Sequence, residues 1–162
     1  MSAVAPEGAK ADAMPVPRRE MGRGMPRHAR RRLTMAKKVL NIVECAYRAT
    51  LEEQDDTVIW IVHAMKGAGG DLAVLLRGNA VNYTVKGQDA AGLQFGERKQ
   101  TRPPNLEEDV AKLVPKGVEV FYVEEDLAER GAAGEALIAG VKPVKRMDVP
   151  KLMGRYDQVW HW

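Results

Sequence analysis

The chain has 162 residues, the length of one ordinary domain, and its 45% hydrophobic and 29% charged residues suit a protein with a buried core rather than a disordered or membrane chain. Its single cysteine, Cys45, excludes a disulfide framework and a multi-cysteine zinc site, and it fits a reducing cytoplasm. The net charge of +3 is uneven, because residues 1–35 carry +5 and the rest about −2, which argues against a folded domain that binds nucleic acid.

Residues 1–35 are rich in Ala, Pro, Gly and Arg. They contain no aromatic residue, no Ile and a single Leu, Leu33. Such a segment cannot bury enough apolar area to offset the entropy of ordering, so we expect a disordered basic tail before a folded domain at 36–162. Met35, which precedes two lysines and a strand-like run, is an alternative start of translation. A targeting signal and a nucleic-acid arm remain open as readings of the arginines.

The folded part begins with a short apolar run at 39–43, which predicts a buried strand. Residues 58–65 fit a strand by their β-branched side chains and a helix by their spacing at i, i+3, i+4 and i+7. The N-cap candidates at 55–57 and the glycines after the run favour the helix. A second buried strand is expected at 71–76, followed by a short helix near 80–86.

The stretch up to Pro104 then predicts a long loop, which is typical of a segment that covers or lines a site. Asn105 is expected to cap a helix at 106–114, with acids in its first turn. A third strand at 118–123 follows. The remaining chain predicts helical turns at 126–131 and 135–139, an extended piece at 141–144, a short helix capped by Asp148 and a last strand at 158–162. Strands that alternate with helices indicate an α/β fold with a mostly parallel sheet of about five strands.

Four stretches of this pattern resemble the DsrE/DsrF-like family of small sulfur-relay proteins. They are Lys37–Cys45, the strand end Leu75–Val81 with its Arg-Gly-Asn, the segment Val118–Gly131 and the ending Tyr156–Trp160. The resemblance spans nearly all of 37–162. It implies a three-layer DsrE-like fold, homo-trimers or hexamers, sulfur-relay proteins as partners, and persulfide chemistry on a cysteine without any cofactor.

The resemblance implies that the persulfide-carrying cysteine of active members lies at the end of the third strand. It precedes the glycine of an Arg-Gly pair by about eight residues. Here the position falls on Val123. Cys45, at the carboxyl end of the first strand, is then the candidate nucleophile, because sites of open α/β sheets form beyond the carboxyl ends of strands. Arg48 supplies a nearby positive charge that favours a thiolate, and Glu44 opposes it. A buried, inert cysteine is the alternative.

Several polar side chains are expected to line the same edge of the sheet. Arg77 and Asn82 are candidates to contact an anion, and Asn79 is a candidate helix cap. Glu124 and Glu125 fit acid–base or metal chemistry, but acids before a helical turn also stabilise its N-terminus. Arg130 is a candidate either to pair with these acids or to orient an anion at the site. We assign no metal site.

The sequence thus leads to two main functional hypotheses. The first is a cytoplasmic protein of the sulfur-relay type, which acts as a carrier, an accessory subunit or a small-molecule binder, with enzymatic activity dependent on Cys45. The alternative is a non-catalytic binding or assembly module without covalent chemistry. A carboxylate-based hydrolase is a third, weaker reading. Neither a membrane nor, for the folded part, a nucleic acid is an expected partner.

Overall fold

The structure is a computed structural model of the whole chain, and it describes residues 37–47, 56–88 and 92–162. Internal contacts divide the chain into two units, Met1–Thr34 and Met35–Trp162, and every described residue belongs to the second. Arg48, one of the predicted site residues, lies outside the described residues.

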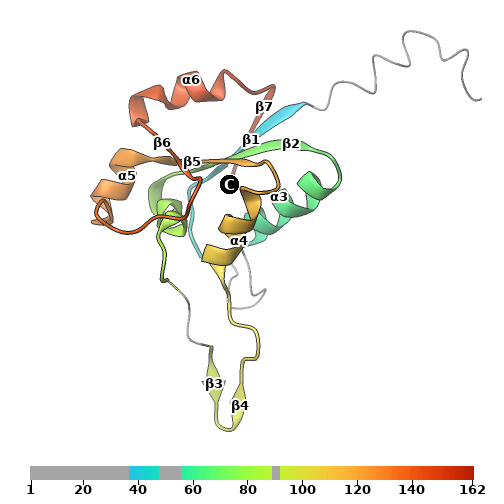
Figure 1. Cartoon of the computed structure of the whole chain (residues 1–162), viewed down its shortest axis with the longest axis vertical. Coiled ribbons are helices and arrows are strands. Elements are labelled where there is room, and N and C mark those ends of the chain that lie inside the picture. Colours follow the sequence, from blue (N-terminus) through green and yellow to red (C-terminus); the bar gives the residue numbers. More distant parts are fainter. Residues whose placement is uncertain (1–36, 48–55, 89–91) are drawn as a thin grey trace, which may run out of the picture. The chain divides into compact units, whose positions relative to one another are not determined.

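A five-stranded parallel sheet forms the centre of the second unit (Figure 1). Its order is β6-β5-β2-β1-β7. The predicted α/β fold with a parallel sheet of about five strands is confirmed. The strands are β1 (Lys38–Val43), β2 (Asp71–Leu76), β5 (Glu119–Val123), β6 (Lys142–Val144) and β7 (Gln158–His161).

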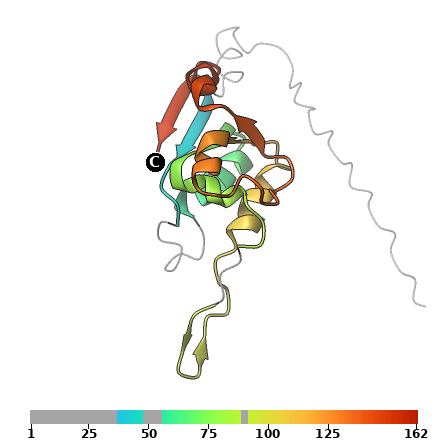
Figure 2. The same cartoon turned by 90° about the vertical axis from the view of Figure 1, so that its left-hand side faces the viewer.

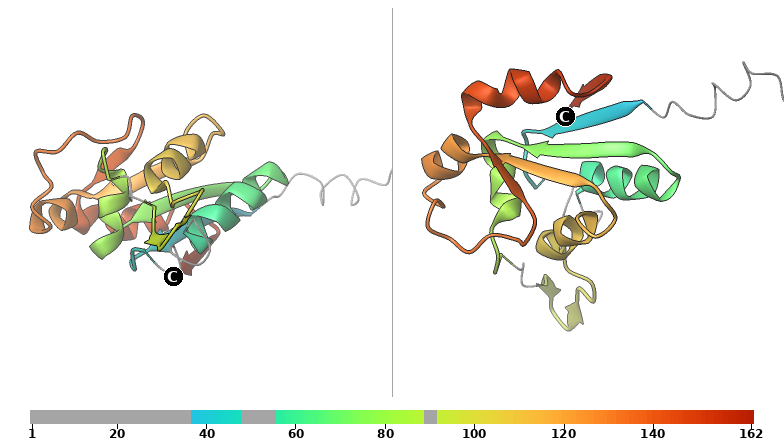
Figure 3. Two further views of the ribbon diagram at one scale, coloured as in Figure 1. Left: turned by 90° about the horizontal axis from the view of Figure 1, so that it is seen from below. Right: turned by 45° about the horizontal axis from the view of Figure 1, so that its top comes forward.

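Helices cover the sheet on both faces, which gives three layers (Figure 3). The first face carries α3 (Thr57–Gly67), the 3₁₀ helix η1 (Gly78–Thr84) and α4 (Leu106–Leu113). The second face carries α6 (Val149–Met153), which follows a 3₁₀ turn, η2 (Arg146–Asp148). The short helix α5 (Glu124–Glu129) begins directly where β5 ends.

The central strands read as continuous apolar runs because both of their faces are buried. In β1, Val39 and Val43 pack into the core of the first face, and Leu40 and Ile42 pack into that of the second. The polar exception is Asn41, which is 1% exposed. Its amide donates to the Ala73 carbonyl, and its Oδ1 accepts from the Trp162 indole, both at 3.3 Å, so its burial leaves neither group unpaired.

The segment that fitted both a strand and a helix is the helix α3, as the sequence favoured. Asp56 is its N-cap, and its Oδ1 accepts hydrogen bonds from the N–H groups of Val58 and Ile59 at 2.9 and 3.0 Å. This cap satisfies two of the donors that the first turn of a helix leaves free. Within the described residues, no helix has both the length and the apolar composition to cross a bilayer.

Two predictions of local structure were wrong. The expected loop before Pro104 contains a β-hairpin of β3 (Gln94–Phe95) and β4 (Arg98–Lys99), which extends away from the sheet (Figure 2). Strands of two residues are too short to show a period in the sequence. Residues 135–139 are not helical, because Ile138 is buried in the core and its N–H donates to the Thr84 carbonyl at 2.8 Å, beside a bridge between Leu137 and Val85.

Candidate functional site

The carboxyl ends of all five strands meet at one edge of the sheet, because the strands are parallel. We call this edge, with the residues that directly follow the strands, the carboxyl edge. Ligand sites of open α/β sheets lie at this position. The residues that reach it are Glu44 and Cys45 after β1, Arg77 and Gly78 after β2, Glu124–Glu129 after β5, Lys145 and Arg146 after β6, and His161 and Trp162 at the end of β7.

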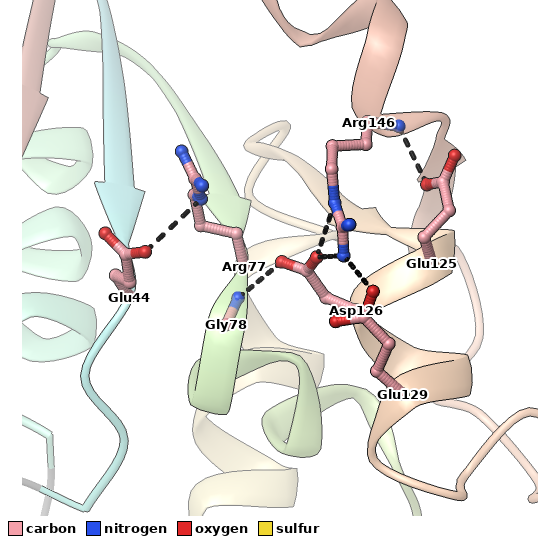
Figure 4. A network of polar contacts seen from close by, with 7 residues as sticks. All are labelled: Glu44, Arg77, Gly78, Glu125, Asp126, Glu129 and Arg146. Carbon is pink, nitrogen blue, oxygen red and sulfur yellow. Dashed lines mark hydrogen bonds and ion pairs between the residues drawn. The ribbon is translucent and has the colours of Figure 1, made fainter.

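Glu44 joins the ends of three strands. Its Oε1 lies 3.6 Å from the Arg77 Nε, and its Oε2 lies 2.7 Å from the His161 Nε2 (Figure 4 shows the Arg77 contact). The three side chains are 37–55% exposed, so each pair contributes at most about 1 kcal/mol to folding. Their main effect is local, because two potential cations offset the negative charge of Glu44 beside Cys45.

Asp126 is the second junction of the carboxyl edge (Figure 4). Its Oδ2 accepts from the Gly78 N–H at 2.6 Å, and its Oδ1 accepts from the Arg146 guanidinium at 2.6 and 3.2 Å. Burial alone would raise the pKa of Asp126, but the Gly78 hydrogen bond and the charge and hydrogen bonds of Arg146 hold that pKa below its usual value. The carboxylate therefore stays ionised and links β2, α5 and the segment after β6.

Arg146 also binds two further acids of α5. Its guanidinium also donates to Glu129 at 2.7 Å, and its backbone N–H donates to Glu125 at 2.7 Å. The hydrogen bonds to Asp126 and Glu129 raise the pKa of Arg146, so it remains a cation. The carboxylates are thus gathered on a cation, and the described residues contain no group of three or more His, Cys, Asp or Glu side chains placed to hold a metal ion.

The close approach of β1 and β2 at this edge requires glycine at Gly78. Its φ is +56°, and a Cβ atom there would lie 3.1 Å from the Glu44 Cγ and 3.3 Å from the Glu44 carbonyl oxygen. Glycine adopts this conformation without strain, and it has no Cβ to press on Glu44, while its N–H donates to Asp126. Arg77 and Gly78 therefore take part in both junctions of the carboxyl edge, Arg77 through Glu44 and Gly78 through Asp126.

Cys45 is exposed, and it directly follows Glu44. The backbone before it is fixed, because the Glu44 N–H donates to the Trp162 carbonyl at 3.3 Å. The backbone after it is anchored through Tyr47, whose N–H donates to the buried hydroxyl of Tyr83. That hydroxyl donates in turn to Asp56 at 2.8 Å. The exposed thiol thus lies on a segment held on both sides, and the expectation of a buried cysteine is wrong.

Val123, the position at which the resemblance to DsrE/DsrF-like proteins places a cysteine, is 1% exposed. It packs in the core of the second face together with Leu75 and Phe121, and it is also the N-cap residue of α5. A side chain at this position faces the protein interior. Solvent therefore reaches the side chain of Cys45 after β1 but not the side chain at the carboxyl end of β5.

The other predicted site residues are only partly brought together. Arg77 and Glu125 take part in the junctions described above, whereas Asn79, Glu124 and Arg130 are exposed and Asn82 is half-buried. Arg130 makes no side-chain hydrogen bond or ion pair with any residue that the structure describes. The expected partner role of Arg130 falls to Arg146, which sequence reasoning missed, although its place just after the predicted extended piece at 141–144 was a usable signal.

A cavity of about 560 Å³ lies beside the carboxyl edge, between β6 and α6. Phe121 and Leu152 form part of its apolar wall, and Lys145 and Lys151 are among its cations. Glu124 is the one predicted site residue on its wall among the residues described. The volume suits a small organic molecule.

Comparisons with known proteins identify the fold. No protein-family profile matches the chain, and no curated protein matches it. Its structure is similar to that of the ychN protein from E. coli, with a TM-score of 0.60 and 18% identity over 78% of this chain and 99% of that one. It is also similar to the protein of unknown function MTH1491 from Methanobacterium thermoautotrophicum, with a TM-score of 0.52 and 15% identity over 76% and 98% of the two chains.

A third similar structure is the conserved protein of unknown function BT1422 from Bacteroides thetaiotaomicron, with a TM-score of 0.50 and 9% identity over 77% and 95% of the two chains. At these identities the likeness shows a common α/β fold, and it carries no activity from one protein to another.

Proposed function

We propose that this protein is a DsrE-like sulfur-relay protein that carries sulfur as a persulfide on Cys45. The observation that carries the proposal is the exposure of this thiol at the carboxyl edge of the parallel sheet. The fold shared with ychN supports it, and so do the residues that resemble the DsrE/DsrF-like family. The natural setting for such a carrier is a reducing compartment such as the cytoplasm.

The transfer step needs only a persulfide donor, R–S–SH. The Cys45 thiolate attacks the terminal sulfur of the donor, a bond forms between Sγ and that sulfur, and the S–S bond of the donor breaks. The donor leaves as the thiolate R–S⁻. The step involves no net oxidation, so it requires neither a cofactor nor a metal.

The electrostatics of the carboxyl edge are compatible with a sulfur anion at Cys45. An unpaired carboxylate next to the thiol would oppose the negative charge of a thiolate. Glu44 is the adjacent carboxylate, and its two oxygens are engaged by Arg77 and His161. Its repulsion of an anion on Cys45 is therefore reduced.

The test is the intact mass of the protein after exposure to a small-molecule persulfide donor. The parent protein should gain one sulfur atom, a reductant should remove that atom, and the Cys45→Ser variant should gain none. A parent protein that gains no sulfur under conditions that load a free thiol control would contradict the carrier function. Sulfur gained equally by the Cys45→Ser variant would also contradict it.

The second candidate is a non-catalytic binding module, and the cavity of about 560 Å³ beside α6 favours it. Under this alternative, the cavity binds a small molecule and Cys45 has no chemical role. Native mass spectrometry of the purified protein distinguishes the two candidate functions. The binding module predicts a bound small molecule that is also present in the Cys45→Ser variant. We further propose a homo-oligomer, a trimer or hexamer, which light scattering of the purified protein tests.

A further inference from the structure

The two outer strands of the sheet differ in how their free edges are protected. The edge strand β6 consists of Lys142, Pro143 and Val144. Lysine and proline are the residues with which edge strands avoid pairing with other chains, because one adds charge and the other removes a backbone donor. The opposite edge strand, β7, contains Gln158, Val159, Trp160 and His161, with no lysine, arginine, acid or proline.

The backbone of β7 also directs groups outward that pair with no strand in the described part of the chain. The Trp162 N–H donates to the Ile42 carbonyl at 3.0 Å, and the Trp162 carbonyl accepts from the Glu44 N–H at 3.3 Å, so both of its groups face β1. In a parallel ladder this orientation alternates along the strand. Trp160 therefore also faces β1, whereas the N–H and C=O groups of Val159 and His161 point outward. No strand among the described residues pairs with that side.

We propose that the outer edge of β7 pairs antiparallel with β7 of a second copy of this chain, across a twofold axis at Trp160. The pairing is self-complementary, because the axis brings Val159 opposite His161 of the second copy. Each of these residues has both its N–H and its C=O directed outward, so the two exchange hydrogen bonds on either side of the axis. The two five-stranded sheets then form one continuous sheet.

The side chains at the axis suit such a contact. Trp160 is half-buried, and Trp162 is 39% exposed. Their rings meet edge to face with centroids 6.4 Å apart. At the axis, Trp160 would stand opposite the second copy's Trp160 in a pair without backbone hydrogen bonds, the position at which cross-strand side chains come closest. Aromatic side chains of this kind contribute most to the affinity of protein interfaces.

The contact goes beyond the proposed function, because it names the surface and the symmetry of assembly. Antiparallel pairing directs the carboxyl edges of the two copies in opposite directions, so it leaves each Cys45 accessible. An even-numbered assembly such as a dimer or a hexamer contains this contact, and an isolated trimer does not. Its test measures mass in solution and not sulfur loading, so its failure is distinguishable from failure of the carrier function.

The experiment is sedimentation velocity of the full chain over a concentration series, with the Val159→Pro variant. Proline at this position removes an outward-facing donor and none of the donors that pair with β1, and it also replaces a valine that packs against the core of the second face. The parent should form an even-numbered assembly, and the variant should sediment with half the parent's mass or less. Circular dichroism and thermal unfolding report whether the variant is folded.

A second pair of variants keeps the test decisive where proline prevents folding. Val159→Lys places a charge on β7 in place of a half-buried valine, and Gln94→Lys places the same charge on an exposed strand of the hairpin. Only Val159→Lys should reduce the mass. A monomeric or trimeric parent would overturn the proposal. So would an unchanged mass for the folded Val159→Pro and Val159→Lys variants, which would assign the edge to another segment or partner.

Discussion

The Asp126→Asn variant tests how the second junction of the carboxyl edge is held together. Asparagine keeps the shape of the side chain but has one acceptor oxygen and one donor amide group. Asp126 accepts from Gly78 on one oxygen and from Arg146 on the other. Whichever way the amide is turned, one donor of the protein then faces a donor of the side chain.

The magnitude follows from burial. The Asp126 side chain is 8% exposed, so a mismatched donor there costs about 1.5–3 kcal/mol, the range for hydrogen bonds to charged groups. The Arg146 side chain is 49% exposed, so its ion pair adds at most about 1 kcal/mol. We expect a loss of about 2–3 kcal/mol in the free energy of unfolding. For a domain of this size, that corresponds to a decrease in Tm of roughly 6–15 °C.

The pH dependence has a defined sign. Because the folded state lowers the pKa of Asp126, its contribution to stability is present above the ordinary aspartate pKa of about 4 and is lost as the pH falls below it. The stability difference between the parent and Asp126→Asn should therefore be largest near neutral pH and should shrink below about pH 4.

Urea denaturation of both proteins at pH 7 and at about pH 3.5 measures these differences. Glu124→Gln is the matched control, because Glu124 lies in the same turn, is exposed, and forms no ion pair with the residues that the structure describes. It should change stability by less than about 0.5 kcal/mol. If Asp126→Asn were as stable as Glu124→Gln at neutral pH, the hydrogen bonds of Asp126 would not stabilise the carboxyl edge.

Two further substitutions test a buried hydrogen bond and a close packing contact of the folded unit. Tyr83→Phe removes the hydroxyl that joins Tyr47 to the buried Asp56, so it should cost about 1–3 kcal/mol in urea denaturation, and a change within experimental error would contradict that link. Gly140→Ala should cost about 1–3 kcal/mol, because φ is +88° and the added Cβ would lie 2.7 Å from the Val114 Cγ1. Gly134→Ala, where nothing lies within 4 Å of such a Cβ, is its control, and equal stability of the two variants would contradict the packing argument.

The strands were predictable because they are short apolar runs buried on both faces, as at 39–43 and 71–76. The α3 helix was predictable from its cap and spacing rather than from residue preferences, which favoured a strand. A short helix was predictable in the region of η1, but its start at Gly78 was not, because it depends on the contact of Gly78 with Asp126. Such a contact between distant segments leaves no local pattern.

The candidate site was predictable in position but not in connectivity. The topological rule for parallel sheets led to the carboxyl edge, and it placed Cys45 and Arg77 there. It could not show that Glu44 is paired with His161, since 117 residues separate them in the chain. Nor could it distinguish Arg146 from Arg130 as the partner of the acids, because that choice depends on how the segment after β6 returns to α5.

The alkylation rates of thiols at two positions decide whether the reactive end of the sheet is that of β1. The parent is compared with the double variant Cys45→Ser/Val123→Cys, which moves the single thiol from the end of β1 to the end of β5. The folded parent should react with iodoacetamide at a rate close to that of the denatured chain, because Cys45 is exposed. The thiol at position 123 should react only after denaturation, because Val123 is buried. A protected Cys45 together with a reactive thiol at position 123 would instead place the site at the end of β5.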